Sequence, residues 1–199
     1  MRSSVLPAVR QLLFGLCLVF GTVIPSALLA QNASISATTT FLVVRHAERD
    51  GNLDKLTKIG EQRSEILGSV GSALNVQAIY STNTKRTKGT AQPLATMSDT
   101  KIRSYEKPTT DWIASLKRNH SGQVVLIVGH SNTAGLIAGL LAKEKTFDIA
   151  YDEYDALFMI QVSDLGTQSM RLRYGTSSDG AASADPDKMG VIDSVPVGK

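Results

Sequence analysis

Short apolar segments alternate along this chain with longer stretches whose apolar residues recur at helical spacing. The clearest apolar run is Val-Val-Leu-Ile-Val at residues 124–128, and residues 41–44 and 76–80 resemble it. Short runs of this kind, rich in β-branched residues, predict strands that are buried on both faces. Residues 101–105 predict one further strand.

The intervening stretches predict helices at residues 57–74, 84–97, 109–116 and 133–142. Strands that alternate with helices in this way predict a mostly parallel sheet with helices on both faces. The expected fold class is therefore α/β, a three-layer α/β/α sandwich. Residues 156–162 and 168–174 predict a hairpin at the edge of the sheet, because Asp164-Leu165-Gly166 separates them as a turn.

The first predicted helix has a clear start, because Thr57 is placed to cap it. The residues expected to face the core, by their spacing, are Ile59, Ile66, Leu67 and Val70. The residues expected to face solvent are Glu61, Arg63 and Glu65. Gly71 is a possible early end of this helix, and Pro93 predicts a kink or a break in the next one.

The first thirty residues have the composition of a secretory signal peptide. Arg2 and Arg10 come before a nearly continuous apolar stretch at residues 11–24. Residues 25–30 follow it and end in the small residue Ala30, before the polar Gln31. Cleavage is expected after Ala30; the alternative is an uncleaved anchor, because residues 12–30 approach the roughly 20 apolar residues that a spanning helix needs. In both cases the domain is expected outside the cytoplasm, periplasmic or secreted, with no stable membrane insertion once the leader is removed.

Composition adds little beyond an ordinary globular domain. We expect a linker at residues 31–40, one domain at residues 41–175 and a disordered tail at residues 176–199, which is rich in Ser, Ala, Gly and Asp. The net charge is +3, but Arg2 and Arg10 belong to the leader, so 19 basic residues face 18 acidic ones in the remainder. This balance predicts no nucleic-acid partner. The single cysteine, Cys17, also lies in the leader, so the mature domain can form no internal disulfide.

Residues suited to binding an anion follow three of the predicted strands. Arg45-His46 follows the first strand, residues 81–86 follow the second, and His130-Ser131-Asn132 follows the strand at 124–128. The carboxyl ends of parallel strands meet at one edge of a sheet, which is where ligands bind in open α/β folds. Arginine offers paired donors to phosphate oxygens, and a neutral imidazole, with a reference pKa of about 6.5, is a nucleophile. No ligand spacing for a metal accompanies the histidines, so we expect neither a metal nor a cofactor.

These motifs resemble those of the histidine phosphatase superfamily, in its phosphoglycerate mutase-like branch. The resemblance covers residues 39–175 and is closest to small exported members. The matching motifs are Arg45-His46-Ala47, Leu56-Thr57 with Gly60, Tyr80-Ser81 with Arg86-Thr87 and Thr90-Ala91, and Gly129-His130-Ser131-Asn132. It implies the phosphoglycerate mutase-like fold and metal-independent hydrolysis of a small phosphorylated substrate, a phosphomonoester.

The resemblance also implies roles for individual residues. His46 is the expected nucleophile, which becomes phosphohistidine, while Arg45, Arg86 and His130 hold the phosphoryl group. Ser81 and Asn132 are further expected substrate contacts, although Asn132 could instead cap a helix. His120 lies in no motif and is expected to be a solvated turn residue.

The acid that protonates the leaving group is the least defined part of the expected site. Glu106 is the first choice, because it lies closest to the end of the strand at 101–105, although Lys107 beside it also allows a simple exposed ion pair. The remaining candidates are Asp111, Glu48, Asp152 and Glu153. An enzyme without a well-placed acid would favour substrates with good leaving groups, such as phosphohistidine.

Two alternative functions remain open at the level of sequence. The first is a phosphoglycerate mutase-type phosphotransferase, which export and the lack of long capping insertions disfavour. The second is a non-catalytic phosphate-binding protein of the same fold, which the weak assignment of the acid leaves open. The sequence predicts neither the particular substrate nor an oligomeric state.

Overall fold

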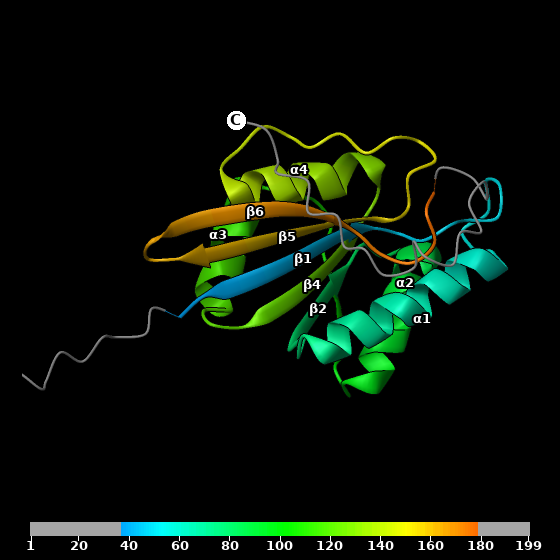
Figure 1. Ribbon diagram of the computed structural model, residues 1–199, viewed down its shortest axis with the longest axis horizontal. Coiled ribbons are helices and arrows are strands. Elements are labelled where there is room, and N and C mark those ends of the chain that lie inside the picture. Colours follow the sequence, from blue (N-terminus) through cyan, green and yellow to red (C-terminus); the bar gives the residue numbers. More distant parts are fainter. Residues whose placement is uncertain (1–36, 179–199) are drawn as a thin grey trace, which may run out of the picture. The chain divides into compact units, whose positions relative to one another are not determined.

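A computed structural model describes residues 37–178, and ten helices and strands alternate along this part of the chain (Figure 1). They are β1 (Thr39–Arg45), α1 (Lys58–Ala73), β2 (Ala78–Ser81), α2 (Lys85–Met97), β3 (Ile102–Ser104), α3 (Thr110–Asn119), β4 (Val124–Gly129), α4 (Ser131–Ala142), β5 (Ala156–Ser163) and β6 (Gly166–Arg173). The predicted signal peptide, residues 31–36 of the linker and residues 179–199 of the tail lie outside the described residues. None of the helices in the described part is long and apolar enough to span a membrane.

The six strands form one sheet in the order β3-β2-β4-β1-β5-β6. The first four of these run parallel to one another, and the β5–β6 hairpin pairs antiparallel with β1. The expected mostly parallel sheet with a hairpin at its edge is therefore confirmed. The register aligns the carboxyl ends of the central strands, because Arg45 pairs with Gly129 and Ser81 pairs with Val128.

Helices cover both faces of this sheet, as the sandwich predicts. Alternate residues of β1 point to opposite faces: Phe41 and Val43 pack with the buried residues of α3 and α4, whereas Leu42 and Val44 pack with those of α1 and α2. Figure 1 shows α1 and α2 together on one side of the strands and α4 on the other. The parallel strands are thus buried from both sides, which explains their continuous apolar runs.

The inward face of α1 differs from the expectation. Ile59 and Ile66 are 58% and 39% exposed, whereas Arg63, expected in solvent, is 2% exposed. The helix instead turns small residues toward α2: a Cβ on Gly68 would lie 3.1 Å from the Cβ of Pro93. Glycine permits this close approach of two helices, but its lack of a side chain gives no apolar signal in the sequence.

Two other local expectations are corrected. Gly71 does not end α1, and Pro93 does not break α2, which continues to Met97. The helix starts are more predictable, since the hydroxyls of Thr57, Thr84 and Thr109 each accept a hydrogen bond from a backbone N–H of the helix that they cap. The predicted cap at Thr57 is therefore confirmed.

Candidate active site

His46 is the first residue after β1 and lies where β1 and β4 end. Its backbone N–H donates to the carbonyl of Gly129 at 2.8 Å, and its side chain is only 4% exposed. The ring nitrogen Nδ1 lies 2.8 Å from the carbonyl oxygen of Ala47. Because a carbonyl only accepts hydrogen bonds, Nδ1 carries the proton and Nε2 keeps its lone pair. Nε2 is thus the ring nitrogen with an available lone pair.

The surroundings of His46 keep its imidazole neutral. Burial has the largest effect and lowers the pKa; the contact with Ala47 partly opposes it, and the charges of Arg45, Arg86 and His130 lower it further, to about 4. At neutral pH the ring is therefore unprotonated, as a nucleophile requires.

Arg45 ties the segment before β5 to the site. Its Nη1 donates to the carbonyl oxygens of Ala150, Tyr151 and Glu153 at 3.0, 2.6 and 3.1 Å. Its guanidinium also lies 4.1 Å from the ring centre of Tyr154, whose ring centre is 6.1 Å from that of His46. Tyr154 is thus a wall of the site that the sequence analysis did not single out.

Arg86 comes from the first turn of α2 and lies between a carboxylate and an imidazole. Its Nη1 donates to Oδ1 of Asp54 at 3.0 Å, and its Nη2 lies 3.3 Å from Nδ1 of His130. Asp54 also accepts from the backbone N–H groups of Lys85 and Arg86, and these hydrogen bonds hold the pKa of its carboxyl below the ordinary value. Asp54 was not predicted, because nothing in its loop distinguishes it from an ordinary solvated acid.

His130 approaches His46 from the end of β4, and the two ring centres lie 5.5 Å apart. It is the N-cap residue of α4, and the hydroxyl of Thr133 accepts its backbone N–H at 2.8 Å. Burial lowers the pKa of His130, and the charge of Arg86 lowers it further. The ring nitrogen Nε2 lies 3.0 Å from the hydroxyl of Thr82.

Two buried donors at this site lack a protein partner. Among the described residues, neither Nε of Arg45 nor Nε of Arg86 makes a hydrogen bond. An unpaired buried N–H is costly, and a charged one more so. Both donors belong to the guanidinium groups beside His46 and His130, so this site holds more hydrogen-bond donors than the protein itself uses. The arrangement suits a phosphoryl group held by two arginines, within reach of a neutral histidine.

The structure gives the two expected substrate contacts different surroundings. The Ser81 side chain is fully buried at the end of β2, and its hydroxyl donates to the carbonyl of Thr82 at 2.8 Å. Asn132 is exposed in the first turn of α4. Because His130 occupies the N-cap position, the alternative of Asn132 as that helix's cap is wrong.

Glu106 is exposed and lies at the same edge of the sheet as the histidines. It directly follows Tyr105, whose backbone N–H donates to the carbonyl of Ser81 at the end of β2. Of the other candidate acids, Asp111 and Asp152 are also exposed.

The remaining two candidate acids are held by structural partners. Glu48 accepts hydrogen bonds from Nε and Nη2 of Arg63, and Glu153 pairs with Arg171 and accepts the backbone N–H of Ala150.

His120 is not the solvated turn residue that the sequence predicted. It is 5% exposed at the end of α3, where Nε2 lies 2.9 Å from the hydroxyl of Tyr80 and Nδ1 lies 2.6 Å from Oε1 of Gln123. These polar neighbours come from β2 and from the turn before β4. Both ring nitrogens of His120 therefore have a hydrogen-bond partner although the ring is buried. Within residues 37–178, no group of three or more His, Asp or Glu side chains is arranged to hold a metal ion.

The fold and this site define an α/β protein with a buried His46, a half-buried His130 and two arginines at the carboxyl edge of its sheet. Residues 41–107 match the family model of the histidine phosphatase superfamily (branch 1). The fold is that of the phosphoglycerate mutase-like histidine phosphatases. A search of curated protein sequences found no significant match.

Solved structures of the same fold are distant in sequence. The mycobacterial glucosyl-3-phosphoglycerate phosphatase aligns with a TM-score of 0.53 and 13% identity, over 62% of this chain and 90% of its own. YhfR of Bacillus stearothermophilus aligns with a TM-score of 0.53 and 17% identity, over 65% and 94%. Phosphoserine phosphatase of Entamoeba histolytica aligns with a TM-score of 0.51 and 14% identity, over 70% and 98%.

Proposed function

We propose that this protein is a metal-independent phosphatase that hydrolyses phosphomonoesters through a phosphohistidine intermediate on His46. The observation that carries the proposal is the pair of Arg45, which is buried, and Arg86, which is half-buried; their unpaired Nε donors lie at the site of a neutral histidine. Phosphoryl transfer needs mainly positioning and compensation of charge on the equatorial oxygens, which these groups supply.

In the first step, Nε2 of His46 attacks phosphorus in line with the ester oxygen. The P–O bond breaks, and the leaving oxygen takes a proton from a general acid, for which Glu106 is the first choice. In the second step, water attacks phosphohistidine, transfers a proton to the same carboxylate and releases inorganic phosphate. Arg45, Arg86 and His130 hold the transferred oxygens in both steps.

The structural relatives support hydrolysis over transfer between substrates. Two of the three are named as phosphatases, one for glucosyl-3-phosphoglycerate and one for phosphoserine. Both names denote small phosphorylated substrates, the class that we propose here. Phosphoglycerate mutase activity is the second candidate, and product analysis with a phosphoglycerate separates the two, since a mutase yields the isomer and a phosphatase yields inorganic phosphate.

The decisive experiment is trapping of the intermediate. The purified domain is mixed with ³²P-labelled acetyl phosphate or a labelled phosphomonoester and quenched, and the protein is tested for an acid-labile, alkali-stable label. We expect label on the wild type and on His120→Gln, and none on His46→Ala. Equal labelling of wild type and His46→Ala would overturn the proposal. Absence of turnover across a broad phosphoester panel, together with retained phosphate binding, would instead favour the non-catalytic alternative.

The proposal includes export. The leader at residues 1–30 is the feature that supports a periplasmic or secreted enzyme. Expression of the full chain, followed by cell fractionation and N-terminal sequencing, is expected to give a mature protein outside the cytoplasm that begins at Gln31. A cytoplasmic protein that retains Met1 would contradict this part of the proposal and leave the chemistry untouched.

A further inference from the structure

A chain of threonine hydroxyls supports His130 from the side away from Arg86. The hydroxyl of Thr82 lies 3.0 Å from Nε2 of His130 and 3.0 Å from the hydroxyl of Thr87. Thr82 is 8% exposed and Thr87 is fully buried. Neither residue has a role in the mechanism described above, yet both bury polar atoms beside the second histidine.

The direction of the hydrogen bonds in this chain follows from the groups at its far end. The hydroxyl of Thr87 lies 2.9 Å from the carbonyl oxygen of Thr82 and 3.1 Å from that of Thr84. Carbonyls only accept, so the single hydroxyl proton of Thr87 is directed to them. The oxygen of Thr87 is then an acceptor for the hydroxyls of Thr82 and Thr84, which lie 3.0 and 2.8 Å away.

The contacts of both ring nitrogens define the role of His130. With the proton of Thr82 directed to Thr87, the oxygen of Thr82 is available to accept a hydrogen bond from Nε2 of His130. On the opposite side of the ring, Nδ1 lies 3.3 Å from Nη2 of Arg86. A guanidinium only donates, so Nδ1 must carry a lone pair. The contact with Arg86 therefore requires the tautomer with the proton on Nε2, and the contact with Thr82 accommodates that proton.

We infer that Thr82 is a positioning residue that fixes His130 in the Nε2–H tautomer and so directs its Nδ1 lone pair toward Arg86 and the anion site. Thr87 acts one step further away, by taking the proton of Thr82. The ring is thereby held from both sides, and Nδ1 is the only ring nitrogen that can gain a proton when a phosphate dianion binds. The catalytic consequence rests on the proposed function; the tautomer itself does not.

The tautomer can be measured directly, because the chain contains only three histidines. In ¹⁵N-histidine-labelled protein, a protonated ring nitrogen and one with a lone pair resonate far apart, and His120→Gln and His46→Ala assign the signals. We expect Nε2 of His130 to be protonated in the wild type. Thr82→Val is expected to give a mixture of tautomers, and Thr82→Ser to restore the wild-type signals.

Thr87→Val provides an opposing test. It removes the acceptor for the Thr82 proton, so Thr82 becomes free to donate to Nε2 of His130. The fraction of His130 with the proton on Nδ1 should then be larger than in the wild type. Thermal melts of each variant check that the fold is retained, and Thr96→Val, on the exposed side of the same helix, is the matched control.

Kinetics with p-nitrophenyl phosphate separate the inference from the proposed function. We expect Thr82→Val to lower kcat about tenfold, the size of one lost orienting hydrogen bond, with recovery to within about twofold in Thr82→Ser and no change in Thr96→Val. A wild-type protein with the proton of His130 on Nδ1, or unchanged tautomers in folded Thr82→Val, would overturn the inference. A protein with the expected tautomers but no phosphohistidine would overturn the proposed function alone.

Discussion

The carboxylate of Glu48 accepts hydrogen bonds from Nε and Nη2 of Arg63 at 3.0 and 2.7 Å, which makes a largely buried bidentate ion pair two residues after His46. Burial alone would lower the pKa of Arg63, but the hydrogen bond and the charge of Glu48 raise it above the ordinary value. The same guanidinium donates to the carbonyls of Tyr174 and Thr176 at 2.8 Å. The pair thus fastens the loop after His46 to α1 and to the chain beyond β6.

Removal of one partner of this pair should destabilise the protein strongly. Glu48→Ala leaves Arg63 charged and without its carboxylate in a site that is 2% exposed, and we expect the free energy of unfolding to fall by about 3 kcal/mol. Urea denaturation measures this change. The matched control is Glu65→Ala on the exposed face of α1, expected within about 0.5 kcal/mol of wild type. A loss below about 1 kcal/mol in Glu48→Ala would show that the pair is not a structural clamp.

The pair also illustrates which parts of the fold were predictable. Strands such as residues 124–128 can be predicted from the sequence, because a strand that is buried on both faces must be apolar throughout. The inward face of α1 was predicted only at Leu67, because the rest of that face consists of small residues and of Arg63. The burial of Arg63 depends on Glu48 and on carbonyls more than a hundred residues away. A pattern along one helix carries no information about such partners. The burial of His120 was missed for the same reason, because His120 lies at the end of α3 and its partner Tyr80 lies on β2.

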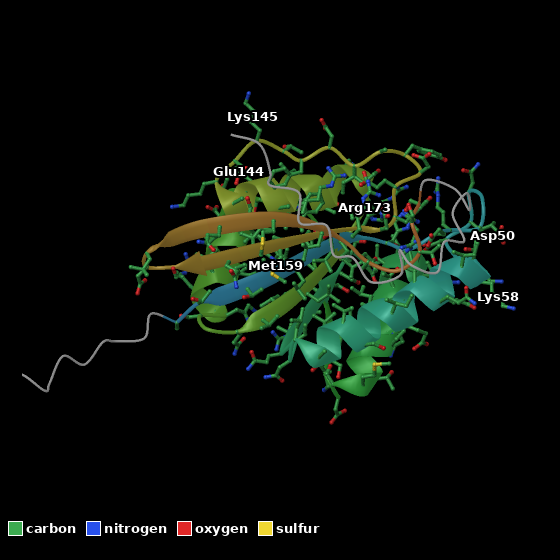
Figure 2. All side chains as sticks on the ribbon, in the orientation of Figure 1. Asp50, Lys58, Glu144, Lys145, Met159 and Arg173 are labelled. Atoms are coloured by element: carbon green, nitrogen blue, oxygen red, sulfur yellow. The ribbon has the colours of Figure 1, made fainter. Side chains whose placement is uncertain are left out.

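The sequence predicted some of the neighbours at the candidate site and missed others. The parallel register brings the ends of β1 and β4 together, so the expected meeting of His46 and His130 follows from topology. Asp54 and Tyr154 reach the site from loops, where no periodicity indicates direction (Asp50, in the same loop as Asp54, is labelled in Figure 2). Thr82 lies within segment 81–86, which the sequence placed at the end of a strand. Its role was not predictable, because it depends on a contact with His130 at the start of α4.

The depressed pKa of His46 predicts a stability that falls in mild acid. Its pKa is about 4 in the folded protein, against an ordinary value of 6.5. Above pH 6.5 both the folded and the unfolded chains are unprotonated at this residue, and the full contribution is present. Between pH 6.5 and 4 only the unfolded chain binds the proton, so the free energy of unfolding should decrease by about 3 kcal/mol.

This pH effect can be isolated by comparison with His46→Ala. Urea midpoints measured from pH 4 to 7 should fall more steeply for the wild type than for the variant, although the variant is less stable overall. Parallel slopes in the two proteins would contradict the depressed pKa. Saturating orthovanadate, a phosphate mimic, should flatten the wild-type slope, because a bound oxyanion favours the protonated imidazole.

Two helical glycines should respond oppositely to the same substitution. A Cβ on Gly135 in α4 would lie 1.8 Å from the carbonyl oxygen of Phe147, whereas one on Gly89 in α2 would meet only the side chain of Leu56, with Cδ1 at 3.2 Å and Cγ at 3.6 Å. Alanine gains about 1 kcal/mol of helix propensity at either position. Gly89→Ala should therefore be neutral or stabilising, because the end of a leucine side chain can shift.

Gly135→Ala must instead displace the backbone of the segment that leads to the Arg45 contacts. We expect a loss of about 1–3 kcal/mol, and faster proteolysis around Tyr151, which is 77% exposed. Thermal melts and limited trypsin or chymotrypsin digestion measure the two effects. Equal stability of the two alanine variants would show that residues 143–149 do not pack against α4 as described.

The general acid is tested by the leaving group rather than by activity alone. Glu106 is exposed at the sheet edge that holds His46, and a carboxyl that protonates the ester oxygen matters most when that oxygen is a poor leaving group. Glu106→Gln should lower kcat/KM for an alkyl phosphate on the order of 100-fold, and for p-nitrophenyl phosphate by less than about tenfold. Asp111→Asn, an exposed acid in the first turn of α3, is the matched control and should leave both rates unchanged. An equal loss with both substrates would mean that Glu106 contributes to binding, and an effect confined to Asp111→Asn would transfer the role to that residue.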